Sequence, residues 1–305
     1  MADPATAKLQ AAPVRRERPK TLWGRVSLFL ETIKFEHSVF ALPFAIVSAF
    51  LLAEGAPPAG KLGWVILAMV GMRTFGMGAN RLIDAEIDAR NPRTAARAVP
   101  AGLIKKVEVW AYLAISAAAF AIAVSQLDRL AWYLSPIVLA VLVLYPYTKR
   151  FTWLCHLALG VVYLIVPPAV WIAMSGGVGP GIVVLGFGAM FWVAGFDVLY
   201  STADYKIDTE QGISSIPARF GIPAALWVAR AFHAGAAVLI AAAGLMLGAG
   251  PLYLAGAGAA ALLLAYENDL VRPSNLSKLN MAFFTMNGVI AVIFGTLASL
   301  DAVVF

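Results

Sequence analysis

Long apolar runs separated by short polar segments dominate the chain. Many of them reach or approach 18 residues, the length at which an α-helix spans the hydrocarbon core of a bilayer. Because backbone polar groups inside a bilayer must be satisfied within their own helix, this pattern predicts an all-α, polytopic membrane protein. We expect about nine spanning helices, over residues 36–53, 63–84, 107–126, 130–148, 154–174, 181–203, 222–247, 252–271 and 278–301.

Composition supports the same fold class. The 305 residues are 61% hydrophobic and only 13% charged, about half the charge of a soluble domain, and the mean hydropathy is +0.81. Cys155 is the single cysteine, which excludes an intrachain disulfide. The first twenty residues lack the apolar core of a signal peptide.

Positive charge is distributed unevenly between the two ends of the predicted spans. The predicted outer loops hold only Lys61 and Arg129, whereas the N-terminal arm and the loops on its side hold most of the other Lys and Arg residues. This asymmetry predicts a plasma (inner) membrane protein with a cytoplasmic N-terminus and an outer C-terminus. The net charge of +6 then reflects orientation, so we expect a lipid bilayer and no nucleic acid as partner, and no obligate protein partner is indicated.

Three segments follow from these patterns. Residues 1–20 are predicted to form a basic cytoplasmic arm, and residues 36–305 the nine-helix domain. Between them, residues 21–35 are predicted to form an interfacial helix on the cytoplasmic leaflet, unless they simply begin the first span. Its expected apolar face consists of Leu22, Val26, Phe29, Leu30 and Ile33.

Acidic residues recur at the cytoplasmic ends of two predicted spans. Asn80, Asp84 and Asp88 are spaced by four, which places them on one helix face at the end of the second span. A second stripe follows the sixth span, at the same end, and consists of Asp197, Tyr200, Asp204 and Asp208. The two stripes indicate a weak internal repeat of four helices.

Carboxylates packed at the negative end of a helix dipole repel one another unless cations neutralise them. Oxygen ligands of this kind suit Mg²⁺, which commonly joins protein carboxylates to substrate phosphates. Arg93, Arg97 and Lys149 lie on the same side and can hold a diphosphate. The alternative is that these acids form a solvated helix end paired with nearby arginines.

The motifs resemble those of the UbiA superfamily of intramembrane aromatic prenyltransferases. The first signature, N-x3-D-x3-D followed by N-P-R-T, is present from Asn80 to Thr94. The second, D-x2-Y-x3-D-x3-D, is present from Asp197 to Asp208. The resemblance extends over nearly the whole chain and implies a UbiA-type bundle of about nine helices.

The resemblance also implies roles for individual residues. Asn80, Asp84 and Asp88, with Asp204 and Asp208, would hold Mg²⁺ on the diphosphate of a polyprenyl donor. Arg93, Arg97, Lys149 and Tyr200 would bind the diphosphate itself. Tyr145 would face the reacting carbon, and Asp197 would lie deeper on the second stripe. The catalytic residues implied in this way are Asp84, Asp204, Asp197 and Tyr145.

The acceptor is predicted less directly. The segment Ile33–Ala45, "IKFEHSVFALPFA", resembles the 4-hydroxybenzoate polyprenyltransferase-like branch, which includes the prenyltransferase of the futalosine menaquinone route. The implied acceptor is 4-hydroxybenzoate or 1,4-dihydroxy-6-naphthoate, in ubiquinone or menaquinone synthesis. His37 could bind its carboxylate or take the ring proton, and the intramembrane charge of Arg73 indicates a second acceptor contact. Both residues could instead be structural.

Other functions remain open at this stage. Haem, chlorophyll precursors or a lipid could serve as acceptor within the same superfamily. A transporter with an interfacial acidic site is a further alternative, although transport sites usually lie near the bilayer midplane. His156 and His233 are interpreted as structural, Asn280 and Asn287 as interhelical hydrogen-bonding residues, and Arg230 has no assigned role.

Overall fold

The protein is a bundle of long helices, seen in a computed structural model that describes residues 17–34 and 42–305. The prediction for His37, and that for residues 1–16 of the basic arm, therefore lie outside the described residues. The helices are α2 (Leu22–Thr32), α3 (Leu42–Ala53), α4 (Ala59–Ile83), α5 (Ala85–Arg90), α6 (Lys106–Ser125), α7 (Arg129–Leu144), α8 (Cys155–Leu164), α9 (Val166–Ser175), α10 (Pro180–Ser201), α11 (Tyr205–Gln211), α12 (Ile216–Met246), α13 (Pro251–Leu270) and α14 (Asn287–Val304).

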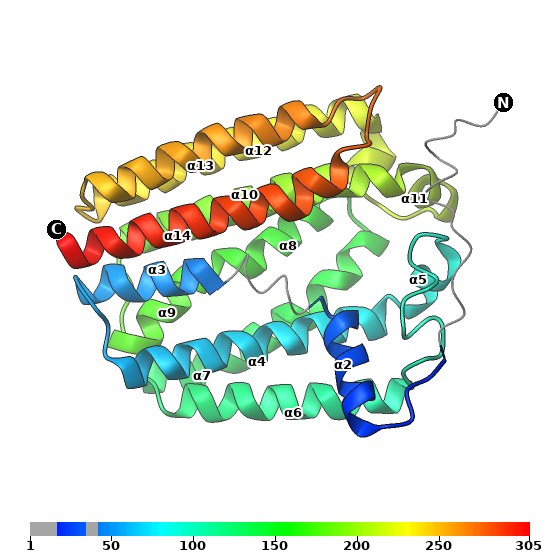
Figure 1. Cartoon of the computed structure of the whole chain (residues 1–305), viewed down its shortest axis with the longest axis horizontal. Coiled ribbons are helices and arrows are strands. Elements are labelled where there is room, and N and C mark those ends of the chain that lie inside the picture. The colour runs from blue at the N-terminus through cyan, green and yellow to red at the C-terminus, as the bar shows by residue number, and fades with distance from the viewer. Residues whose placement is uncertain (1–16, 35–41) are drawn as a thin grey trace.

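Seven helical segments in the described ranges are long and apolar enough to cross a membrane. They are Ala59–Ile83, Lys106–Ser125, Arg129–Arg150, Cys155–Ser175, Pro180–Gln211, Ile216–Met246 and Met281–Val304. The shorter apolar helix α3 and the 20-residue α13 pack beside α14 to complete the bundle (Figure 1). The prediction of an all-α membrane protein is confirmed.

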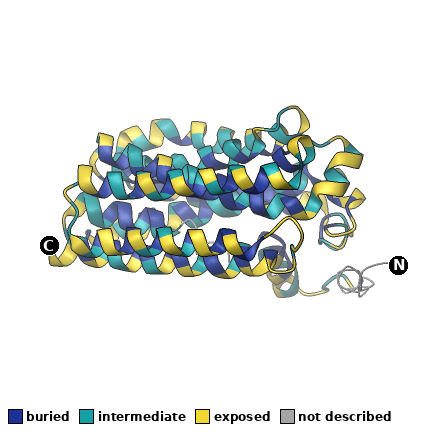
Figure 2. Cartoon of the chain, turned by 90° about the horizontal axis from the view of Figure 1, so that it is seen from above, coloured by how far each residue is buried: buried dark blue, intermediate teal, exposed yellow. Residues whose placement is uncertain are grey.

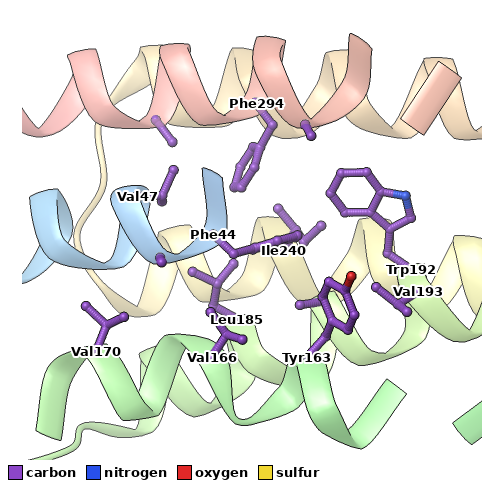
Figure 3. Close-up of a cluster of buried hydrophobic side chains, with 14 of the residues drawn as sticks. Phe44, Val47, Tyr163, Val166, Val170, Leu185, Trp192, Val193, Ile240 and Phe294 are labelled. Carbon is purple, nitrogen blue, oxygen red and sulfur yellow. The ribbon is translucent and has the colours of Figure 1, made fainter. Parts of the chain in front are cut away.

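Helix α10 lies at the centre of the bundle and packs mainly against α12 and α8. Buried residues line the inside of the bundle, while exposed residues form stripes along the outer faces (Figure 2). In the core, Phe44 meets Trp192 edge-on at 5.2 Å between ring centroids and lies 6.0 Å from Phe294 (Figure 3). Since lipid is as apolar as these side chains, close packing rather than water exclusion holds such helices together.

Glycines permit the closest helix approaches, and one of them provides a stability test. A Cβ at Gly186 would lie 2.5 Å from the carbonyl oxygen of Leu164, whereas a Cβ at Gly258 would meet no atom within 4 Å. Gly186→Ala must push α10 away from α8, so we expect a loss of about 1–3 kcal/mol of stability. Gly258→Ala is the matched control and should be neutral or stabilising, because alanine favours helix. Thermal unfolding in detergent measures both.

Helix α2 runs across the direction of the long helices (Figure 1). Leu28, Phe29 and Ile33 are buried against the bundle, and Phe29 stacks on Tyr112 of α6. Leu22, the first residue of the predicted apolar face, is 76% exposed and takes no part in this contact. The inner face is therefore set by packing on α4 and α6 rather than by the full apolar stripe.

The two ends of the bundle differ in character. Helices α5 and α11, the short elements that carry parts of the two acidic motifs, lie at one end together with α2. The C-terminus lies at the opposite end (Figure 1). The sequence motifs are thus gathered at a single end of the helix bundle.

Candidate active site

Both acidic motifs interrupt the helices that carry them. Helix α4 ends at Ile83, Asp84 has φ −92° and ψ 1°, and α5 begins one residue later. Helix α10 ends at Ser201, a 3-10 turn follows, and Asp204 has φ −99° and ψ 2° before α11 begins. The four-residue spacing of the first stripe persists across its break, because Asn80 Nδ2 donates to Asp84 Oδ2 and the Asp88 N–H donates to the Asp84 carbonyl. The two breaks place an aspartate in the same backbone conformation, outside the regular helix.

Asp84 is the most enclosed carboxylate of the site, with 3% of its surface exposed. Its Oδ2 accepts hydrogen bonds from Lys149 Nζ at 2.6 Å and from Asn80 Nδ2 at 2.9 Å. Arg150 Nη1 lies 3.5 Å from Oδ1. Lys149 and Arg150 come from the 3-10 turn Tyr145–Arg150 that follows α7. Three side chains from two elements, α4 and the 3-10 turn, therefore converge on one carboxylate.

Asp88 is held by the loop that follows it. Arg97 Nη1 donates to both oxygens of Asp88, at 2.8 and 2.7 Å. Thr94 Oγ1 donates to the Asp88 carbonyl at 2.9 Å, which folds the N-P-R-T segment back on the helix. The buried Arg81 lies 4.0 Å from Asp88 and donates through Nε to the Thr32 carbonyl of α2. Helix α2 is thereby connected to the first motif.

Arg93 joins the first motif to the second. Its guanidinium donates to Asp204 through Nε, at 2.8 Å to Oδ1, and through Nη2 to Oδ2. Nη1 donates to the Tyr200 hydroxyl at 2.9 Å, and Asn91 Nδ2 also donates to Asp204. Burial lowers the pKa of the Arg93 guanidinium, but the hydrogen bonds and charge of Asp204 and Tyr200 outweigh burial and raise it overall. Arg93 therefore stays charged.

The remaining acids of the second motif contact buried polar groups. Ser215 Oγ donates to Asp208 at 3.2 Å. His156 Nδ1 lies 2.7 Å from Asp197 Oδ2, while the Ile216 backbone N–H donates to His156 Nε2. The latter bond identifies Nδ1 as the protonated nitrogen. His156, interpreted from sequence as structural, thus contacts a predicted site residue. This contact could not be predicted from the sequence, because His156 and Asp197 are 41 residues apart.

Tyr145 and Arg73 lie on the two elements that meet at Asp84. Tyr145 begins the 3-10 turn that carries Lys149 and Arg150, and Arg73 lies on α4, eleven residues before Asp84. Arg73 Nη1 donates to the Tyr163 hydroxyl at 3.4 Å, and its buried Nε has no hydrogen-bond partner among the described residues. Arg73 therefore keeps a donor for another group.

Three further polar residues lie away from the motifs. Arg230 lies over the Trp227 ring at 4.9 Å. Asn287 is fully buried and makes interhelical hydrogen bonds, as predicted, but Asn280 is exposed. A π-helical turn, Met281–Met286, separates the two asparagines, so their seven-residue spacing no longer gives one face.

The donor atoms of the site decide whether a divalent metal ion fits it. Across residues 17–34 and 42–305, no three His, Cys, Asp or Glu side chains come together as a metal cluster. The carboxylates are instead paired with Lys149, Arg97 and Arg93. The donors nevertheless fit Mg²⁺, because all are hard oxygens. Asp84 Oδ1 is buried and accepts no hydrogen bond from the described part of the chain.

Comparison with known proteins identifies the family. The model of the UbiA prenyltransferase family matches residues 41–289. The chain belongs to the UbiA prenyltransferase family. It is therefore a prenyltransferase and an integral membrane protein, which decides against the transporter that the sequence left open.

Relatives of this prenyltransferase are similar along most of their length. The 4-hydroxybenzoate octaprenyltransferase of Aromatoleum aromaticum is 29% identical over 94% of this chain and 98% of its own. That of Vibrio cholerae is 30% identical over 82% and 88% of the two chains. The apo structure of a UbiA homologue from Aeropyrum pernix K1 has a TM-score of 0.79 at 33% identity, covering 87% of this chain and 98% of its own.

A more distant structure supports the fold alone. A UbiA homologue from Archaeoglobus fulgidus, solved with GPP and Mg²⁺ bound, has a TM-score of 0.66 at 17% identity. It covers 90% of this chain and 99% of its own length. The shared fold thus extends over most of the helix bundle and not only over the motifs.

Proposed function

We propose that this prenyltransferase transfers a polyprenyl group from polyprenyl diphosphate to an aromatic acid, with Mg²⁺ as cofactor. The observation that carries the proposal is the joining of both acidic motifs by basic side chains, above all the Arg93–Asp204 pair. Relatives named 4-hydroxybenzoate octaprenyltransferase, and the family structure bound to GPP and Mg²⁺, support the donor, metal and acceptor class.

The diphosphate is assigned to the mouth formed by the two motifs. Asp84, Asp88, Asp204 and Asp208, with the side-chain oxygen of Asn80, would hold Mg²⁺, which supplies positive charge to the leaving diphosphate. Arg93, Arg97 and Lys149 would turn from their carboxylates to the phosphate oxygens. Tyr200, hydrogen-bonded to Arg93, lies beside the same oxygens. These groups stabilise the negative charge that develops as the C–O bond breaks.

The remaining steps use residues beneath the diphosphate. The leaving diphosphate keeps the bonding electrons, and the allylic cation left behind faces Tyr145. A ring carbon of the acceptor attacks this cation and then loses its proton. We assign Asp197 as the base, because His156 holds one carboxylate oxygen and leaves Oδ1 for the ring proton.

An apolar cavity of about 340 Å³ is suited to the donor's tail. Its lining includes Met69 and Met72 of α4, Phe120 of α6 and Val138 of α7. Met72 and Leu164, which also lines the cavity, are the chain neighbours of Arg73 and Tyr163. The cavity thus lies close to the backbone of Arg73. A polyprenyl chain bound in the cavity would stay in an apolar environment.

Arg73 is the residue we assign to the acceptor carboxylate, since its Nε lacks a partner. Arg73→Gln should raise the KM for an aromatic acid by about 10–100-fold, the size expected for hydrogen bonds to a charged group, while the donor KM stays within about twofold. Wild-type enzyme should prefer 4-hydroxybenzoate to 4-hydroxybenzamide, and the variant should not. Steady-state kinetics with both acceptors tests this, and a preserved preference in Arg73→Gln would contradict the assignment. His37 is a second acceptor candidate on sequence grounds.

Orientation and attachment are also part of the proposal. The excess of Lys and Arg at the motif end supports a plasma membrane protein with its mouth and N-terminus in the cytoplasm. Helix α2 would lie on the cytoplasmic leaflet, with the exposed Leu22 and Trp23 in the headgroup region.

Product mass spectrometry tests the proposed function. Protein in lipid vesicles receives Mg²⁺, a polyprenyl diphosphate and either 4-hydroxybenzoate or 1,4-dihydroxy-6-naphthoate. Prenylated hydroxybenzoate would assign the enzyme to ubiquinone synthesis, and a prenylated naphthoate product to menaquinone synthesis. Turnover with haem, a chlorophyll precursor or a lipid instead would overturn the acceptor class while leaving the family unchanged.

A further inference from the structure

The π-helical turn Met281–Met286 is held open by one buried asparagine. Asn287 Nδ2 donates to the carbonyls of Ala282 at 3.2 Å and Phe283 at 3.1 Å, both within the turn. The same nitrogen donates to Glu267 Oε1 of α13 at 3.0 Å. Asn287 Oδ1 accepts from Trp192 Nε1 of α10 at 2.5 Å. The Asn287 amide therefore fixes the turn to two neighbouring helices.

The turn directs two phenylalanines toward the second acidic motif. Phe283 stacks on the Tyr200 ring, with centroids 4.0 Å apart and an interplanar angle of 24°. Phe284 meets the same ring edge-on at 5.7 Å. A π-turn has more residues per turn than an α-helix, so adjacent side chains diverge less. This geometry lets consecutive residues contact a single tyrosine.

These rings continue into the site through Tyr200. Phe196 of α10 meets Phe283 edge-on at 5.2 Å, which completes an aromatic wall of Phe196, Phe283 and Phe284. The Tyr200 hydroxyl accepts from Arg93, whose guanidinium also lies 5.0 Å from the ring centroid. A continuous series of contacts thus runs from Asn287 through the wall to the residue that joins the two motifs.

We propose that Asn287 is a positioning residue, which holds the aromatic wall so that it keeps water away from the allylic cation. The inference rests on the proposed prenyl transfer. After the diphosphate leaves with the bonding electrons, the cation can bond to a ring carbon of the acceptor, which then loses a proton. It can also bond to water, which loses a proton and gives the prenyl alcohol. Aromatic faces stabilise a cation and provide no nucleophile.

The ratio of prenyl alcohol to prenylated acceptor distinguishes a positioning role of Asn287 from a general effect on protein stability. Asn287→Ala removes the hydrogen bonds that hold the turn, and Phe283→Leu alters the wall directly while leaving Asn287 intact. Both should raise the ratio of prenyl alcohol to prenylated acceptor by about fivefold, the effect of losing one cation–π contact. Phe283→Tyr should restore the wild-type ratio, because it keeps the aromatic face.

Phe191→Leu is the matched control. Phe191 also lies on α10 and packs on an aromatic residue, Phe232, at 5.5 Å, but it belongs to a ring pair separate from the wall. Its product ratio should equal that of wild type. The assay uses the full chain in lipid with Mg²⁺, a polyprenyl diphosphate and 4-hydroxybenzoate, and quantifies both products by mass spectrometry.

The possible outcomes are distinct. If Phe283→Leu lowers total turnover without changing the ratio, the wall does not shield the cation and the inference is wrong. Should Asn287→Ala fail to fold, Phe283→Leu and Phe283→Tyr still decide the role of the wall, and Trp192→Phe tests the asparagine by removing only the donor to its Oδ1. Wild-type protein that forms neither product from any acceptor would overturn the proposed function itself.

Discussion

Asp84→Asn is expected to lower the rate of prenyl transfer by about a thousandfold or more, because this substitution removes a charge from the proposed metal–diphosphate site. Asp84 accepts from Lys149 and Asn80 and lies at the break between α4 and α5. The amide keeps the shape of the side chain. Product formation by mass spectrometry, at saturating donor, measures the loss.

Glu86→Gln provides the control for this substitution. Glu86 lies two residues further along, on α5, and its side chain is exposed. It loses the same charge in the same segment, yet its rate should remain close to that of wild type. Both proteins should have similar unfolding temperatures, because Lys149 and Arg150 are partly exposed and stay hydrated without Asp84. Near-normal turnover by Asp84→Asn would refute the metal–diphosphate assignment.

Removal of divalent metal should take prenyl transfer below detection, and added Mg²⁺ should restore it. Without metal, Asp84, Asp88 and Asp204 would face the diphosphate with uncompensated negative charge once their basic partners turn to the phosphates. Activity is measured after chelation and dialysis, and again after titration with Mg²⁺. Full activity in the chelated enzyme would contradict the proposed cofactor.

Binding of the metal can also be tested without turnover, from the unfolding temperature of the protein. Ligands that bind only the folded protein raise its unfolding temperature, and the rise grows with the logarithm of ligand concentration over Kd. Mg²⁺ and diphosphate together should raise the unfolding temperature by more than the sum of their separate effects. Ca²⁺ serves as the ionic control, because it prefers longer bonds and more ligands than Mg²⁺. Equal, additive shifts would indicate two independent sites.

The spanning helices were predictable because their signal is large. An apolar run of about twenty residues has few alternatives, and the second and sixth spans, expected at 63–84 and 181–203, are observed at Ala59–Ile83 and Pro180–Ser201. Family membership was also predictable from the sequence, since two acidic motifs with fixed spacing are a specific combination. Both predictions depend on patterns that are local in the sequence.

The details of the site were less predictable, because they depend on contacts between distant segments. Helical spacing placed Asp84 and Asp204 on regular helices, but hydrogen bonds from Lys149 and Arg93 accompany breaks at both positions. His156 lies 41 residues from Asp197 in the sequence, and no periodicity connects them. The π-turn before Asn287 was hidden for the same reason, since side-chain hydrogen bonds maintain it.

Pairing of basic residues with carboxylates should also decide which anions the mouth admits. A free phosphate or sulfate ion that drew Arg93 away from Asp204 would leave the carboxylate without a counter-charge. A diphosphate that arrives with its own divalent cation compensates the arginine and the carboxylate together. The resting ion pairs would thus select among anions. They would disfavour simple anions such as phosphate and sulfate, and would favour a diphosphate that carries its own divalent cation.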